Sequence, residues 1–154
     1  MAQEILEGTK TPVPHRQTVS VNPFGLMFEW FNGEYERKVN DRSTFGVSAS
    51  GFSLDGGDTD YVNGALFYRF YPQRAALSGF FIGGRGGVHR VSTNSDADVF
   101  FGLGFELGYA WLFGADRRFG VSIGAGATRL FGGDLEGSSL TIPTFRLINV
   151  GIAF

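Results

Sequence analysis

The stretch Val99–Phe113, VFFGLGFELGYAWLF, carries the clearest structural signal in this 154-residue chain. Its odd positions are all apolar or aromatic, whereas its even positions are mostly small and include Glu106. A period of two indicates a β-strand, because successive side chains of a strand point to opposite faces. Strands of globular proteins usually span about 5–6 residues, while a strand tilted by about 45° crosses a bilayer in roughly 9–11. The stretch therefore predicts a transmembrane β-strand with its odd residues toward lipid and its even residues toward a lumen.

The composition is typical of a small closed barrel. The chain has 24 glycines, which relieve crowding among the inward side chains of a narrow barrel. No window approaches about 18 uninterrupted apolar residues, so we expect no transmembrane helix. The absence of cysteine excludes disulfides and thiolate metal sites, and a net charge of −2 offers no basic surface for nucleic acid. Met1–Gly8 lacks the features of a signal peptide, so we expect that a secretion signal has been removed.

Alternation divides the rest of the chain into strands and connections. We expect residues 1–17 to form an N-terminal periplasmic arm and residues 18–154 to form the barrel. The alternation shifts phase at Pro23, so 18–39 is either one bent strand or two strands joined by a tight turn at Glu29–Gly33. Short connections (40–42, 73–76, 114–118) then alternate with longer ones (55–60, 92–97, 132–139), as periplasmic turns and external loops do in outer-membrane barrels.

The strand number follows from this alternation. Outer-membrane barrels have an even number of strands, which favours two strands rather than one within 18–39 and leaves both chain ends on the periplasmic side. We therefore predict an all-β fold, an eight-stranded antiparallel up-and-down transmembrane β-barrel. Beyond the first strand and Val99–Phe113, the strands are expected at 31–39, 43–54, 61–72, 79–91, 119–131 and 140–154.

The C-terminus resembles the terminal signal of outer-membrane β-barrels. In that class a final aromatic residue and alternating apolar residues are read by the barrel-assembly machinery, and the matching residues here are Ile148, Val150, Ile152 and Phe154. A second stretch, Asn22-Pro23-x-x-Leu26 onward to Tyr35-Glu36-Arg37 and Asp41-Arg42, resembles a family of small bacterial outer-membrane barrels of undefined function. Gly33 departs from that pattern, where such families commonly have an apolar residue.

The resemblance to outer-membrane barrels covers about residues 18–154, whereas the resemblance to the small-barrel family rests on residues 22–42 alone. Together they imply a fold and a location in the bacterial outer membrane, but no activity. The partners they imply are the lipid bilayer, lipopolysaccharide and the assembly machinery, and we expect a monomer that binds no nucleic acid and no cofactor.

Six polar residues fall in the lumen phase and form the candidate site. An eight-stranded barrel is only wide enough for side chains to fill it. Charges inside must pair, because desolvation costs several kcal/mol per ion. We therefore favour a structural salt-bridge network over a proton or solute path. These residues are Glu34, Glu36, Arg69, Arg85, His89 and Glu106, with Asn63 and Asn149 as further candidates.

Two expectations concern individual arginines. Pairing the strands about the centre of 92–97 sets Arg85 opposite Gly104 and diagonal to Glu106, so Arg85 is the first expected partner of Glu106 and Arg69 the second. Arg129 and Arg146 fall in the lipid-facing phase, where they would reach the membrane interface or lipopolysaccharide phosphates. A local bulge that turns them inward is the alternative.

The expected function is a structural or loop-mediated interaction role, without catalytic residues. One alternative is an outer-leaflet lipid-modifying enzyme that uses His89 and Ser92, but residues three apart on a regular strand face opposite ways. The other is a lipocalin-like carrier of a small apolar ligand, which also has eight strands. A carrier would place the large side chains of Val99–Phe113 inside a small barrel, where they pack badly.

Overall fold

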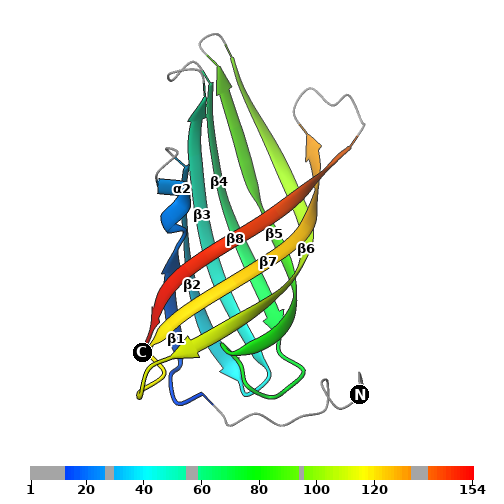
Figure 1. The fold of residues 1–154 in the computed structure, drawn as a ribbon. Helices are drawn as coiled ribbons and strands as arrows, with labels where there is room; N and C mark the ends of the chain where they lie inside the picture. The colour runs from blue at the N-terminus through cyan, green and yellow to red at the C-terminus, as the bar shows by residue number, and fades with distance from the viewer. Residues whose placement is uncertain (1–12, 27–29, 55–58, 94–95, 133–138) are drawn as a thin grey trace.

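The computed structural model describes residues 13–26, 30–54, 59–93, 96–132 and 139–154. Within these residues each strand pairs antiparallel with the next along the chain, and β1 pairs with β8, so the sheet closes on itself (Figure 1). The predicted eight-stranded antiparallel up-and-down barrel is thereby confirmed. Its strands are β1 (Gln17–Val21), β2 (Trp30–Asn40), β3 (Ser43–Leu54), β4 (Thr59–Phe70), β5 (Gly79–Thr93), β6 (Ala97–Phe113), β7 (Phe119–Gly132) and β8 (Leu140–Ala153).

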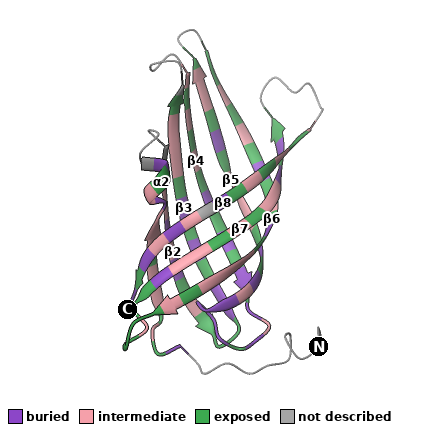
Figure 2. Cartoon of the chain, viewed as in Figure 1, coloured by how far each residue is buried: buried purple, intermediate pink, exposed green. Residues whose placement is uncertain are grey.

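Strand β6 separates apolar and polar side chains as its sequence predicts. Phe105 and Leu107 lie on the outer surface with 56% and 43% of their area exposed, whereas Glu106 between them is 4% exposed. Exposed and less exposed positions alternate in the same way along β4 (Figure 2). The barrel therefore has an apolar outer surface and a charged interior, which is the reverse of a water-soluble protein.

The described part of the connection from β1 to β2 contains a helical turn, α2 (Pro23–Leu26), and β2 already begins at Trp30, so the tight turn predicted at Glu29–Gly33 is wrong. Asn22 caps the turn, because its Oδ1 accepts hydrogen bonds from the backbone N–H groups of Phe24 and Gly25, both at 3.0 Å. Pro23 follows in the first helical position, where its missing N–H costs nothing. Gly33 lies inside β2 opposite Ala49, and Glu29 itself lies outside the described residues. The two-strand alternative is nonetheless correct.

The connection from β4 to β5 is longer than the predicted turn at 73–76, since it runs over residues 71–78. It is folded against the end of the barrel, with Tyr71 1% exposed and Ala76 fully buried. The Tyr71 ring packs on Phe81 of β5 with their centroids 5.6 Å apart. The backbone N–H of Ala76 donates to the carbonyl of Asp41 in the neighbouring β2–β3 turn at 3.0 Å. This connection therefore covers part of one end of the lumen.

The start of β1 and the C-terminal residue Phe154 meet at that same end of the barrel. The N–H groups of Arg16 and Gln17 donate to the Phe154 carbonyl at 3.1 and 2.9 Å, and Phe154 donates back to Gln17 at 2.9 Å. The connections 41–42, 71–78 and 114–118 lie at this end, as the predicted alternation requires (Figure 1). Among the described helical residues, none form a helix long and apolar enough to cross a membrane.

Candidate functional site

The centre of the lumen is built around the guanidinium of Arg69, which projects inward from β4 and is 1% exposed. Each of its three nitrogens contacts a different carboxylate. Nε lies 2.5 Å from Glu106 Oε1, Nη1 lies 2.6 Å from Glu36 Oε2, and Nη2 lies 3.0 Å from Glu34 Oε2. The guanidinium also lies over the Phe67 and Phe81 rings, 3.9 and 4.9 Å from their centroids. Arg69 thus joins β2, β4 and β6 through the interior.

A glycine on β5, the strand between β4 and β6, makes room for Arg69 to reach Glu106. Glu34 and Glu36 lie two apart on β2 and therefore share its inner face. On β5, Gly83 lies opposite both Arg69 and Glu106. A Cβ at Gly83 would meet Arg69 Cγ at 3.1 Å and Glu106 Cγ at 3.2 Å. The glycine therefore leaves the space in which Arg69 crosses β5 to reach β6.

Two hydroxyl groups complete the coordination of Glu36. Its Oε1 accepts hydrogen bonds from Tyr71 OH at 2.8 Å and from Thr44 Oγ1 at 2.5 Å. Burial and the neighbouring Glu36 carboxylate raise the pKa of Tyr71 well above its usual value, so the phenol remains a proton donor. The sequence marks neither hydroxyl as a partner of Glu36, because the alternation predicts Tyr71 within the 61–72 strand and Thr44 carries no charge.

Arg146 is buried in the lumen, so its predicted lipid-facing position is wrong. It is 7% exposed, and its Nη1 contacts Glu34 Oε2 at 2.5 Å. The register explains the difference, because Ser122 pairs with Asn149 while Gly124 pairs with Arg146. Residues 147 and 148 therefore both lie opposite the single residue Ile123, which is a β-bulge. The bulge reverses the phase of β8 and turns Arg146 and Asn149 to the same side.

Arg129 and Arg85 occupy the positions that their phase predicts. Arg129 is exposed on the outside of β7, where its Nε donates to Ser139 Oγ at 2.8 Å. Arg85 lies opposite Gly104 in the predicted register, and its Nη2 donates to Ser48 Oγ at 3.1 Å. Its Nη1 is 4.0 Å from Glu106, so Arg69 and not Arg85 makes the short contact with that carboxylate.

His89 lies in the lumen apart from these charges. Its Nδ1 is 2.5 Å from Tyr61 OH, and Asn63 Nδ2 donates to the same hydroxyl at 3.0 Å. Ser92 is three residues further along β5 and faces the other side of the sheet. The structure therefore does not bring His89 and Ser92 together as a base and a nucleophile.

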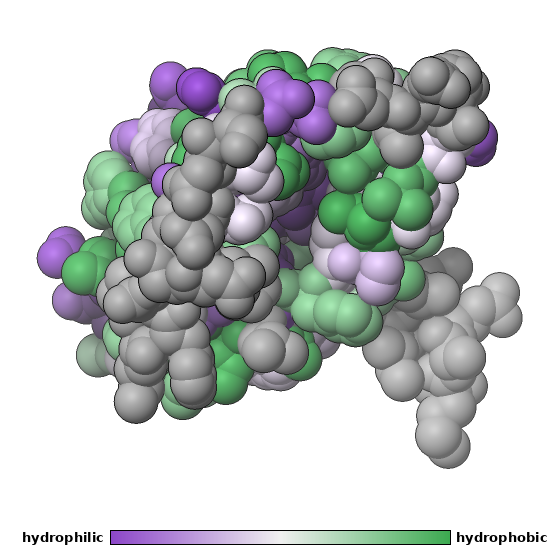
Figure 3. All heavy atoms as spheres, turned by 90° about the horizontal axis from the view of Figure 1, so that it is seen from above, coloured by the Kyte–Doolittle hydropathy of each residue, from purple (hydrophilic) through white to green (hydrophobic). Residues whose placement is uncertain are grey.

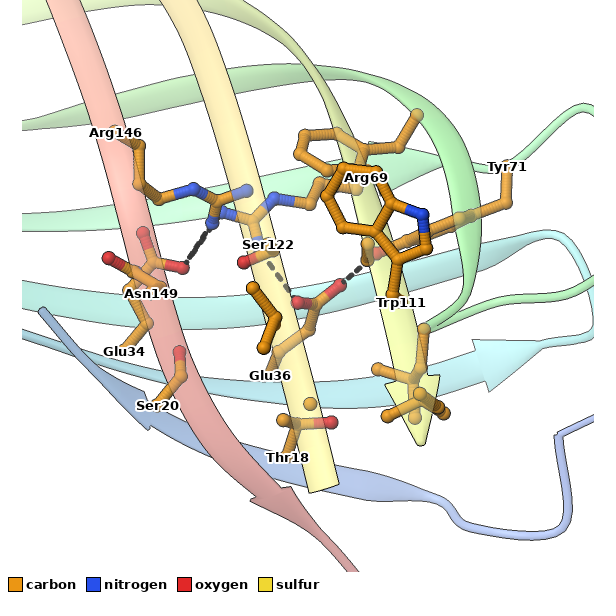
Figure 4. Close-up of a pocket in the computed structure, with 16 residues that line it drawn as sticks. Thr18, Ser20, Glu34, Glu36, Arg69, Tyr71, Trp111, Ser122, Arg146 and Asn149 are labelled. Atoms are coloured by element: carbon orange, nitrogen blue, oxygen red, sulfur yellow. Dashed lines mark hydrogen bonds and ion pairs between the residues drawn. The ribbon is translucent and has the colours of Figure 1, made fainter. Parts of the chain in front are cut away.

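Two small cavities of about 30 Å³ each lie beside the network. The first, drawn in Figure 4, has a polar wall of Thr18, Ser20, Ser122 and Asn149. The second is lined in part by Asn32, Arg85, Glu106 and Thr144. A water molecule requires a cavity of about 10–15 Å³, so each can hold about two waters. No cluster of three or more potential metal ligands occurs in the described part of the chain.

The described geometry defines a closed antiparallel barrel with an apolar exterior and a charge-paired core. No protein family matches the sequence, and no curated protein matches it. The chain is similar to a solved structure, the backbone structure of the Yersinia pestis outer membrane protein Ail in a phospholipid bilayer nanodisc. The two are 14% identical, the match covers 91% of this chain and 99% of that one, and the TM-score is 0.49. The fold assignment therefore rests on the strand pairing of this chain itself.

Proposed function

We propose that this chain is an integral protein of the bacterial outer membrane. The observation that carries the proposal is the ring of exposed apolar side chains around the barrel, to which every strand contributes. Soluble monomers rarely expose a contiguous apolar patch larger than about 300–600 Å². An apolar band around a closed barrel is what a bilayer requires of a β-protein. One member from each strand, in chain order, is Val19, Phe31, Val47, Leu66, Val88, Leu103, Ile123 and Phe145.

The contacts with the membrane follow from the same surface. Ile152 and Phe154 are 62% and 53% exposed on the outside of the barrel, where a terminal signal formed with Ile148 and Val150 would be read by the assembly machinery. Arg129 lies outside near the barrel end opposite the chain termini, within reach of lipopolysaccharide phosphates. Arg146 takes no part in this contact, because it is buried.

The interior supports a structural or interaction role without chemistry of its own. In the Arg69 cluster three carboxylates are balanced by three guanidiniums, those of Arg69, Arg85 and Arg146. Ligand pockets for drug-sized molecules measure about 300–1,000 Å³, far more than the two lumen cavities. Neither of these two lumen cavities has room for the cargo of an apolar-ligand carrier, so we assign the binding of partners to the ends of the barrel.

Folding in detergent tests the proposal. The chain is expected to fold in micelles to a β-rich monomer whose gel mobility shifts on boiling. When secreted by a Gram-negative host, it should be extracted from the outer-membrane fraction only by detergent. Phe154→Ala provides a matched variant that keeps the backbone hydrogen bonds to Arg16 and Gln17 but removes the terminal aromatic ring, and it should reduce assembly in cells more than folding in micelles. A stable, detergent-free monomer with the same β-spectrum would contradict the membrane assignment.

A further inference from the structure

The Glu34–Arg146 ion pair separates the two lumen cavities. These two residues line both cavities, and they are the only ones among the described lining residues that do so. The first cavity extends toward the end with the chain termini, where Thr18 and Trp111 contribute to its wall. The second lies beyond the pair, beside Asn32 and Thr144. One contact of 2.5 Å therefore divides two spaces that are each large enough for water.

Buried polar atoms indicate that both spaces are wet. The amide oxygen and nitrogen of Asn149 and the hydroxyl of Thr18 have no hydrogen-bond partner in the described protein, and both residues line the first cavity. Asn32 Oδ1, which lies beside the second cavity, is also buried without a hydrogen-bond partner in the described protein. An unsatisfied buried polar group costs about 1–3 kcal/mol, a cost that water removes where it fits.

Arg146 is held less firmly than Arg69. All three nitrogens of the Arg69 guanidinium contact carboxylates, whereas only Nη1 of Arg146 does, and Arg146 Nε and Nη2 have no partner among the described atoms. Glu106 also lines the second cavity and offers Arg146 another carboxylate. If Arg146 leaves Glu34, the Glu34 carboxylate still keeps its contact with Arg69. Arg146 and Glu34 then each keep an oppositely charged partner, so moving Arg146 from Glu34 to Glu106 has a low free-energy cost.

We propose that Arg146 is a gate for small ions and water. Bound to Glu34, it keeps the cavities apart. Turned toward Glu106, it joins them into one wet path along the β8 side of the lumen, while the Arg69 cluster fills the other side. Seen from the end opposite the chain termini, the centre of the barrel is hollowed and carries hydrophilic side chains (Figure 3). The path rests on the proposed function, since conduction across a membrane requires insertion into one.

The test is ion conductance of the full chain in planar lipid bilayers in potassium chloride, after insertion is verified by the gel shift. Arg146→Ala should raise the time-averaged conductance about tenfold or more over the wild-type protein, the factor that corresponds to about 1.4 kcal/mol in a gating equilibrium. Arg90→Ala is the matched control, because Arg90 is exposed on the outside of β5 and lines neither cavity. It should change the conductance by less than about twofold, a few tenths of a kcal/mol.

Because Arg146→Ala removes a buried cation, Glu34→Gln provides a second way to break the same contact while keeping the shape of the side chain. It should raise the conductance in the same sense. Inserted Arg146→Ala or Glu34→Gln protein that conducts no more than wild type would overturn the gate, and so would an equal rise in Arg90→Ala. Wild-type protein that fails to insert would instead refute the membrane assignment, so the two failures are distinguishable.

Discussion

Replacing Arg69 with Met is the sharpest perturbation of the charged core. The substitution keeps much of the side-chain volume but removes contacts to Glu106, Glu36 and Glu34 at 2.5, 2.6 and 3.0 Å. A sum of three charge-assisted hydrogen bonds at about 1.5–3 kcal/mol each would overstate the loss, because two of the carboxylates keep another cation. Glu34 retains Arg146, and Glu106 retains Arg85 at 4.0 Å.

Glu36 alone loses its cation, and it is left with the hydroxyls of Tyr71 and Thr44. Removing one partner of a buried ion pair costs about 3–5 kcal/mol, which is the expected loss in the free energy of unfolding for Arg69→Met. The assay is urea unfolding in lipid vesicles. Arg42→Met, at an exposed position in the β2–β3 turn, is the control and should change the stability by less than about 0.5 kcal/mol.

A double-mutant cycle with Glu36→Gln isolates the coupling. Once the Glu36 charge is gone, Arg69→Met leaves no carboxylate without a cation. The double variant should therefore be more stable than the sum of the two single losses predicts, by about 1–3 kcal/mol. Additive losses would show that Arg69 and Glu36 do not interact, and the central contact described above would be refuted.

Three further predictions concern the outer surface, the bulge and the β4–β5 connection. Leu107→Arg places a cation in the middle of the lipid-facing side of β6 and should cost about 2–4 kcal/mol in vesicles, whereas Leu107→Phe should be nearly neutral; equal stability of the two would refute the facing of β6. Arg146→Leu should lower the free energy of unfolding by about 1–3 kcal/mol, because Glu34 loses a buried hydrogen-bond donor. A higher free energy of unfolding in this variant would show that Arg146 faces outward. Tyr71 has a raised pKa, so the folded protein retains a proton that the unfolded chain releases above about pH 10. The stability from this group is complete below that pH and falls above it, and Tyr71→Phe should flatten the fall measured by urea unfolding between about pH 9 and about pH 11; an unchanged slope would contradict the assignment.

The long strands and their facing were predictable because a period of two is a local property of the sequence. Val99–Phe113 shows its facing without reference to any other strand, and the register that sets Arg85 opposite Gly104 follows from the centre of one connection. Pairing beyond the neighbouring strand was not predictable in the same way. Arg69 reaches Glu106 over an intervening strand because Gly83 leaves room, and that depends on the three-dimensional path of a long side chain.

The three errors in strand facing and connections share one physical origin, since each lies where the backbone leaves the regular strand. The bulge opposite Ile123 reverses the phase of β8, so a facing extrapolated back from Phe154 misplaces Arg146. In the sequence Asn22-Pro23 only breaks the alternation, whereas in the structure it begins and caps a helical turn. The segment 71–78 has the polar and small residues of a turn, and its burial arises from contacts with Phe81 and with the β2–β3 turn.

Collision measurements on nitroxide labels test the membrane-spanning barrel most directly. The chain has no cysteine, so a single introduced cysteine carries a unique label. Labels at Phe105 and Leu107, on the exposed side of β6, are compared in lipid vesicles with a label at Asp116 in the β6–β7 turn. We predict frequent collisions with oxygen and rare collisions with a water-soluble nickel chelate at the two strand positions, and the opposite at Asp116. Nickel collisions at Phe105 and Leu107 as frequent as those at Asp116 would contradict a lipid-facing outer surface.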